Sequence, residues 1–293
     1  MLGFHDPEIM GWYTALINLS DIAACGGIPK GMLVSLEMPA NHRVSDLERF
    51  YVGLMSALRK YNTPLLGGNL KASTKFSATG TILGQSGARP ITRRISAKEC
   101  QVFLVGRCGE FWASVISHHQ SMLNTSPAIK SSLFNALAFP AAQLEAGRAL
   151  SSVSFEVACM DCSDGPANAL YQLAAVNELE LTLRDHPPWN MTKHAVEILS
   201  HAGIEIDNAC YHFGDWQLAV LVPENDVNDF LNAMKDFPLT CMGHAAKGVG
   251  RVKTCDGRVL VRDSLNENFR RGYNSMNNVD ELINRYMREP VFE

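Results

Sequence analysis

The sequence lacks several features that would each assign a class of protein. No apolar run approaches the roughly 20 residues that a helix needs to span a bilayer, and the residues after Met1 do not predict a secretory signal. The net charge is not basic either, since the chain has 26 lysines and arginines and 30 aspartates and glutamates, which gives a net charge of −4. Nucleic-acid binders usually carry a basic face. We therefore expect neither a membrane nor nucleic acid as the main partner.

The cysteines do not suggest a disulfide or zinc framework. All eight stand singly in apolar segments except the C-x-x-C pair Cys159 and Cys162, and no second pair of cysteines or histidines lies nearby to complete a zinc site. Scattered thiols of this kind are typical of a reduced protein in which cysteine acts as a small hydrophobe. We predict a cytoplasmic protein, and a redox or metal role for the pair stays open as a minor alternative.

The chain of 293 residues is long enough for two domains. Helical and strand patterns are mixed along it, which predicts an α+β (mixed α/β) fold. A change of pattern at Gly106 predicts an N-terminal domain over 1–105 and a C-terminal domain over 106–293. The first predicted helix is capped by Asp6, begins at Pro7 and is stopped by Gly26-Gly27. Further helices are predicted over 45–58, 110–122, 141–153, 168–176, 191–201, 227–237 and 280–287, and strands over 32–38, 63–66, 76–83, 101–105, 155–159, 178–183 and 216–222. A hairpin is predicted around Asp256-Gly257.

The first predicted helix carries a single polar stripe on an otherwise apolar surface. Thr14, Asn18 and Asp21 follow at i, i+4 and i+7, so they share one face. A stripe of this kind is often the solvent face. A helix with so little polar surface should be largely buried, however, and a buried carboxylate is costly unless it is paired or bound to a cation. Both interpretations remain open from the sequence.

Three later segments combine turn residues with acidic or small side chains. Gly67-Gly68-Asn69 follows a predicted strand, which predicts a turn whose amides could approach an anion, although the spacing matches neither a Walker A nor a Rossmann loop. In 161–166 two carboxylates, Asp161 and Asp164, lie between a strand and a helix start. They could hold Mg²⁺ near a phosphate, or Ser163 or Asp164 could be an ordinary N-cap. In 214–218 a loop with Asp215 enters a strand.

Taken in order, these segments resemble thiamine-monophosphate kinase and, more distantly, the aminoimidazole-ribonucleotide synthetase (PurM-like) superfamily. The resemblance covers nearly the whole chain. The segments that carry it are Asn18–Ala24 with Gly26 and Pro29, Leu66–Asn69, Thr92-Arg93, Asp161–Gly165 and Asp215–Leu218.

The resemblance implies a two-domain PurM-like fold, in which an N-terminal domain joins a partner chain in a dimeric barrel and a C-terminal α+β domain packs against it. It also implies ATP and Mg²⁺ as cofactors and transfer of the terminal phosphoryl group of ATP to a small, phosphorylated substrate. Phosphoryl transfer depends mainly on positioning and charge neutralisation. Carried over by position, the implied catalytic and metal residues are Asp21 and Asp164, with Asn69 as a further metal ligand. The nucleotide-binding residues are Gly67, Gly68, Asn69, Arg93 and Ser163, and the substrate-binding residues are Asp215 and Trp216.

The sequence also departs from the pattern of the family. Complete members begin with a further segment that holds paired aspartates, and Asn69 stands where the family has aspartate, which offers Mg²⁺ a neutral oxygen in place of a charged one. Gln217 likewise replaces a carboxylate. These losses support a second hypothesis, a catalytically degenerate relative that binds nucleotide or acts as a dimer partner. A third is that the chain is a fragment. We expect a homodimer, or a heterodimer with a related chain, with weaker association than in complete members.

Overall fold

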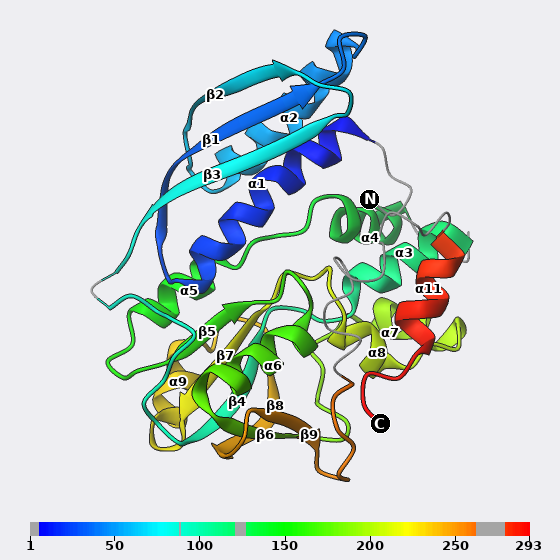
Figure 1. The fold of residues 1–293 in the computed structure, drawn as a ribbon. Helices are drawn as coiled ribbons and strands as arrows, with labels where there is room; N and C mark the ends of the chain where they lie inside the picture. The colour runs from blue at the N-terminus through cyan, green and yellow to red at the C-terminus, as the bar shows by residue number, and fades with distance from the viewer. Residues whose placement is uncertain (1–5, 88, 121–126, 262–278) are drawn as a thin grey trace.

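The computed structural model describes residues 6–87, 89–120, 127–261 and 279–293. The fold is a mixed α+β arrangement with two separate sheets, one of three strands and one of six. The three-stranded sheet lies at one end of the molecule and the six-stranded sheet at the other, with helices α1 and α5 between them (Figure 1). The α+β class predicted from the sequence is therefore confirmed.

The three-stranded sheet is formed by the first part of the chain. Its order is β2-β1-β3, with β1 parallel to β2 and antiparallel to β3. The helices α1 and α2 pack against each other and cover one face of the sheet (Figure 1). The elements of this part are α1 (Pro7–Ala24), β1 (Ile28–Met38), α2 (Val44–Lys60), β2 (Leu65–Ala72) and β3 (Ser77–Gln85).

Helix α1 begins and ends where its sequence predicts. The Asp6 carboxylate accepts a hydrogen bond of 2.9 Å from the Glu8 amide, and Pro7 occupies the first turn, where its missing N–H costs nothing. The helix ends before Gly26, whose φ of +64° is left-handed and favours glycine. Side chains on most sides of α1 are buried, so this helix is a central element of the core.

Two glycines allow α1 and α2 to approach each other closely. A Cβ atom on Gly11 would lie 1.9 Å from the carbonyl oxygen of Phe50, and one on Gly53 would lie 1.8 Å from the carbonyl oxygen of Glu8. Both distances are far below van der Waals contact, and both neighbours are backbone atoms that cannot move aside alone. The spacing of the two helices therefore depends on glycine at both positions.

The six-stranded sheet is formed by the rest of the chain. Its order is β5-β7-β4-β8-β6-β9, and all neighbouring pairs are antiparallel except β6 and β9. Helix α6 packs on this sheet, whereas α3, α4, α7, α8 and α11 lie to one side of it (Figure 1). The strands are β4 (Glu99–Val105), β5 (Ala158–Asp161), β6 (Leu179–Leu183), β7 (Leu218–Pro223), β8 (Leu239–Lys247) and β9 (Arg251–Thr254). The helices are α3 (Glu110–Gln120), α4 (Pro127–Ala138), α5 (Leu144–Ser151), α6 (Pro166–Asn177), α7 (Lys193–His201), α8 (Ile206–Tyr211), η1 (Glu224–Asp226), α9 (Val227–Ala233) and α11 (Val279–Arg288).

The structure corrects the predicted elements at several places. The turn predicted at Gly67-Gly68 is wrong, because β2 continues through both glycines to Ala72. Helices α4 and α8 and strand β8 were not predicted, and residues 121–122, the end of one predicted helix, lie outside the described residues. The second arm of the predicted hairpin is reduced to bridges such as Lys253–Val259.

The pairing of strand β4 shows where the chain passes from the three-stranded to the six-stranded sheet. It pairs with β7 and β8, which come later in the sequence, so a division by sheet falls between Gln85 and Glu99. The predicted domain boundary at 106 stays a prediction.

The other face of the three-stranded sheet, opposite α1 and α2, is not covered by the described part of the chain. Leu33, Leu66 and Leu83 lie on this face and are 43%, 53% and 56% exposed. Threonines and serines of β1 and β3 lie on the same face. The described strands therefore form an open sheet and not a closed barrel. In the same residues, no helix combines the length and the hydropathy of a membrane span.

Candidate functional site

The candidate site lies where α1 meets one end of the six-stranded sheet. Strands β4 and β5 end there and β7 begins there, because Val105 and Asp161 both pair with Leu218. The Cys162 amide donates a hydrogen bond of 2.8 Å to the carbonyl oxygen of Gln217, which joins the two segments that flank the site. Two of the motifs found in the sequence, around Asp161 and Asp215, therefore meet at the same end of these strands, next to the helix that carries Asp21.

A buried hydrogen bond connects the helix to the sheet. The Ser20 hydroxyl donates to Oδ2 of Asp161 at 3.1 Å, across 141 residues of sequence. Ser20 has no exposed surface, and Asp161 is only 4% exposed. Asp161 is thus a nearly buried carboxylate, and a buried carboxylate is stable only with hydrogen bonds, a counter-charge or a cation.

Asp21 places a second carboxylate beside Asp161. Partial burial raises the pKa of Asp21, the negative charge of Asp161 raises it further, and Arg93 lowers it. Two neighbouring carboxylates disfavour each other's ionised form. Arg93, an exposed residue, is the cation that acts on Asp21, and its role in binding phosphate stays a prediction.

This pair fits a divalent cation, but not as a complete cage of protein ligands. Within the described ranges, no group of three or more aspartate, glutamate, histidine and cysteine side chains is arranged to hold a metal ion. Mg²⁺ is usually bound by one or two carboxylates together with phosphate oxygens of a substrate. Asp21 and Asp161 match that donor set, since both offer hard, charged oxygen atoms and the charge of one acts on the other.

The segment after Asp161 does not form an ordinary helix cap. The N-cap of α6 is Gly165, with φ +92°, and no side chain caps this helix. The interpretation of Ser163 or Asp164 as the N-cap is therefore wrong. Ser163 is half-buried, and Asp164 is exposed and accepts a hydrogen bond of 3.4 Å from Asn168. An uncapped helix N-terminus preceded by serine favours anions such as phosphate.

Gly67, Gly68 and Asn69 lie away from this pair. They belong to β2, an edge strand, and Asn69 is in register with Ser35 of β1. Ser35 is on the open face of the sheet, whereas α1 with Asp21 packs on the other face. The described residues of this single chain therefore do not bring Asn69 next to Asp21, and its role in binding metal or nucleotide stays a prediction.

Asp215 has a structural role at the start of α3. Its carboxylate accepts hydrogen bonds from the amides of Gly109 at 2.6 Å and Phe111 at 2.8 Å. Burial raises the pKa of Asp215 to about 7, against the lowering effect of these donors. The side chain satisfies amides of the first turn of α3, which have no partner inside the helix. Its predicted contact with substrate stays untested.

Trp216 lies at the same end of the sheet in a strained conformation. Its φ is +56°, which is uncommon for a residue with a large side chain. The ring stacks edge-on against Tyr13 of α1, with 6.1 Å between ring centroids. The buried indole N–H has no hydrogen-bond partner in the described residues. The predicted substrate residue therefore lies against the same helix as Asp21, two turns away from it.

The two thiols of the C-x-x-C pair are buried and form no disulfide. All eight cysteines are free, and burial raises the pKa values of Cys159 and Cys162, which have almost no exposed surface. A thiol is nucleophilic or metal-binding only as the thiolate. The C-x-x-C pair is therefore part of the core, in agreement with the interpretation of these cysteines as small hydrophobes.

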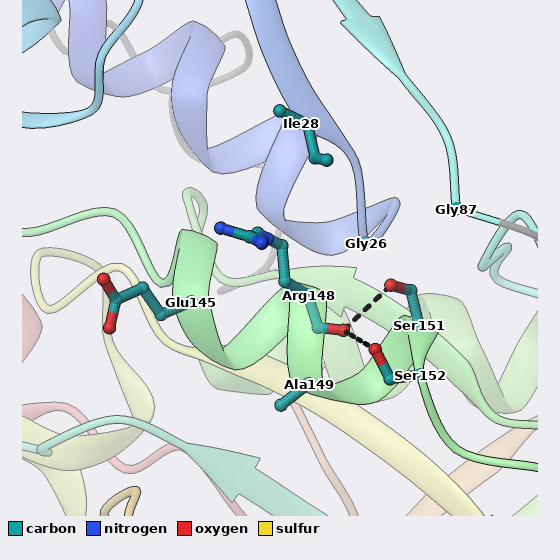
Figure 2. Close-up of a pocket in the computed structure, with 8 residues that line it drawn as sticks. All are labelled: Gly26, Ile28, Gly87, Glu145, Arg148, Ala149, Ser151 and Ser152. Atoms are coloured by element: carbon teal, nitrogen blue, oxygen red, sulfur yellow. Dashed lines mark hydrogen bonds between the residues drawn. The ribbon is translucent and has the colours of Figure 1, made fainter.

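A separate pocket of about 500 Å³ opens beside the C-terminal end of α1. Figure 2 shows that the Ser151 and Ser152 hydroxyls there donate to the carbonyl oxygen of Arg148, at 2.8 and 2.9 Å. Its lining has one acidic and one basic side chain and none of the carboxylates described above, so it is a poorer candidate for phosphate chemistry. The lining residues are Gly26, Ile28, Gly87, Glu145, Arg148, Ala149, Ser151 and Ser152.

Two residues of the site were not selected from the sequence. Asp161 was noted as one of two carboxylates three residues apart, but only Asp164 was assigned a role. Ser20 was not singled out at all. The position of Asp161 at the end of a buried strand was a usable signal. Ser20 lies within the Asn18–Ala24 segment that carries the family resemblance, but its contact with Asp161 forms only in the folded chain.

The chain is similar to several known proteins. The family "AIR synthase related protein, N-terminal domain" matches residues 1–86. The chain is 29% identical to a thiamine-monophosphate kinase from Aquifex aeolicus over 247 residues, which cover 83% of this chain and 76% of the kinase. It is also 29% identical to a thiamine-monophosphate kinase from Bacillus subtilis over 176 residues, but spans only 54% of that protein.

The fold is also similar to solved structures. One, described as AaThiL complexed with AMPPCP and TMP, superimposes with a TM-score of 0.73 at 25% identity, covering 85% of this chain and 77% of the other. The hydrogenase maturation protein HypE in complex with ATP superimposes with a TM-score of 0.66 at 14% identity, covering 84% of this chain and 76% of HypE. The second likeness concerns the fold alone.

Proposed function

We propose that this chain, a relative of the thiamine-monophosphate kinases in the AIR synthase-related (PurM-like) superfamily, is an ATP- and Mg²⁺-dependent phosphotransferase. The acceptor is a small phosphate ester of the thiamine monophosphate class. The observation that carries the proposal is the pair of neighbouring carboxylates, Asp21 and Asp161, one of them nearly buried and fixed by Ser20. Such a pair is costly in a folded protein unless a cation binds it.

Each group at the site has a role that suits phosphoryl transfer. Asp21 and Asp161 would hold Mg²⁺, which when bound neutralises charge on the phosphate oxygens. Arg93 is exposed at the rim and would bind phosphate oxygens. The uncapped N-terminus of α6, with Ser163 before it, would donate backbone hydrogen bonds to an anion. Asp164 would extend the acidic side of the site, and Trp216 would contact the acceptor.

The test is ADP formation by the purified chain. With ATP, Mg²⁺ and thiamine monophosphate, we expect ADP to accumulate above the rate without the acceptor. Because phosphoryl transfer depends on charge neutralisation, omission of Mg²⁺ should abolish it. Coupled detection of ADP measures the rate. No acceptor-dependent ADP over a panel of phosphate esters would contradict the proposal.

A second candidate is a relative that binds nucleotide but does not transfer phosphate. Two observations favour it: the described residues hold no group of three metal-ligating side chains, and Asn69 stands where the family has aspartate. In the same assay this candidate predicts calorimetric binding of an ATP analogue without ADP formation. We also propose a cytoplasmic location, supported by the eight free cysteines.

We further propose that a second copy of the chain covers the open face of the three-stranded sheet. Leu33, Leu66 and Leu83 form an apolar group there, and both edges of the sheet, β2 and β3, end without a neighbouring strand in the described part of the chain. Exposed apolar faces and unpaired sheet edges mark association surfaces.

The dimer predicts a specific response to one substitution. Leu33→Asp places a charge at the centre of the proposed interface and should convert a dimer into a monomer, as measured by light scattering at micromolar concentration. Val52→Asp is the matched control, since Val52 is 53% exposed on α2 and away from the open face. A wild-type monomer would contradict the homodimer and leave a related chain as the partner.

A further inference from the structure

We infer that Ser20 is a positioning residue, which holds the Asp161 carboxylate in the orientation that binds a divalent cation together with Asp21. The inference rests on the proposed function for the identity of the site. It goes beyond that proposal, because Ser20 touches neither nucleotide nor acceptor in it and acts only through Asp161.

The geometry leaves few alternatives for this carboxylate. The backbone of Asp161 is fixed in β5 by pairing with Leu218, so the side-chain torsions are the freedom that remains. The hydrogen bond of 3.1 Å from Ser20 restrains them, and it comes from another element of the fold. Partners that hold a metal-binding carboxylate in place are a general feature of metal sites, and their loss costs about 10- to 100-fold in metal affinity.

Serine is otherwise a poor choice at this position of α1. The neighbouring inward-facing residues Leu16, Leu19 and Ala23 are apolar and have no exposed surface, like Ser20 itself. Alanine would fit both the burial and the helix better, because it forms helices more readily and buries no hydroxyl. The polar group at this position is explained by the carboxylate that it contacts.

The hydrogen bond from Ser20 matters because the two carboxylates repel each other. Neighbouring carboxylates such as Asp21 and Asp161 repel each other when both are ionised. The Ser20 hydroxyl, which lies on the same helix as Asp21, holds the Asp161 carboxylate toward α1. A donor at Ser20 therefore opposes the repulsion until a cation binds.

The experiment compares Mn²⁺ binding by wild type, Ser20→Ala and Ser20→Cys, using electron paramagnetic resonance in the presence of the ATP analogue AMPPCP. We expect Ser20→Ala to bind Mn²⁺ about 10- to 100-fold more weakly. Ser20→Cys, which keeps the shape and a weak donor, should fall between the two. Ser114→Ala is the matched control: Ser114 is also buried, at 2% exposure, and its hydroxyl donates to the carbonyl oxygen of Glu110 inside α3.

The control separates positioning from loss of stability. Thermal unfolding should show similar losses for Ser20→Ala and Ser114→Ala, because each removes one buried hydrogen bond, whereas only Ser20→Ala should lose Mn²⁺ affinity. An affinity of Ser20→Ala within twofold of wild type overturns the inference, as does an equal loss in Ser114→Ala or a wild type that binds no Mn²⁺. If wild type binds Mn²⁺ with AMPPCP but forms no ADP, the proposed transfer reaction is overturned instead. The inference about Ser20 is then still decided by the Mn²⁺ affinities of the variants.

Discussion

Asp161→Asn is expected to abolish most phosphotransferase activity without lowering the thermal stability of the metal-free protein. Activity should fall about 100-fold or more, since a direct metal ligand matters at least as much as its supporting partners. Stability should be unchanged or higher, because the substitution removes the charge that raises the pKa of Asp21, while the amide oxygen can still accept from Ser20. Opposite effects on activity and stability are typical of functional sites.

The measurements are ADP formation and thermal unfolding in the presence of a chelator. Asp236→Asn serves as control, since Asp236 is an exposed carboxylate outside the site, and it should change neither quantity. A marked drop in the stability of metal-free Asp161→Asn would show that the carboxylate has a structural role. Full activity in this variant would remove Asp161 from the proposed site.

Gly53→Ala is expected to lower the free energy of unfolding by about 3 kcal/mol. The added Cβ atom would lie 1.8 Å from the carbonyl oxygen of Glu8, so α1 and α2 must move apart to admit it. Separation of the helices would expose buried apolar side chains of both, such as Leu16 and Leu54, which belong to one core cluster. Helix propensity acts in the other direction, by about 1 kcal/mol, and does not compensate.

Urea unfolding of the wild type and the variant measures this difference. Ser56→Ala on the same helix is the control, because Ser56 is exposed and its substitution should change the free energy of unfolding by at most about 0.5 kcal/mol. Equal stability of Gly53→Ala and wild type would contradict the close approach of α1 and α2.

Much of the secondary structure could be predicted from local patterns. Helix α1 was placed by its cap at Asp6, Pro7 and a terminal glycine, and α2 by its apolar spacing. Errors arose where local patterns conflict with the fold. Gly67-Gly68 predicts a turn, but pairing with β1 holds both glycines in a strand. Strand β8 was missed because Gly243, His244 and Lys247 interrupt its apolar pattern.

The candidate site was predicted in part. Motif order pointed to Asp21, Arg93 and the segment that begins at Asp161, and the charges of Arg93 and Asp161 both act on Asp21 in the structure. Sequence spacing could not decide which of the two carboxylates near the end of β5, Asp161 or Asp164, lies beside α1. Asp161 is the one that faces α1, whereas Asp164 is exposed beside α6. The direction of a side chain at a strand end depends on the elements packed against it.

The sequence by itself determined the fold class, the start and end of the main helices, the lack of a net basic charge and of a long apolar run, and the acidic segments that could bind a cation. These depend on interactions between residues close together in the chain, which local patterns record. Only the tertiary structure decided that Ser20 donates to Asp161, that Asp21 lies beside the same carboxylate and that Asn69 is on another face. Those relations span more than a hundred residues or separate elements, and they exist only once α1 packs between the two sheets.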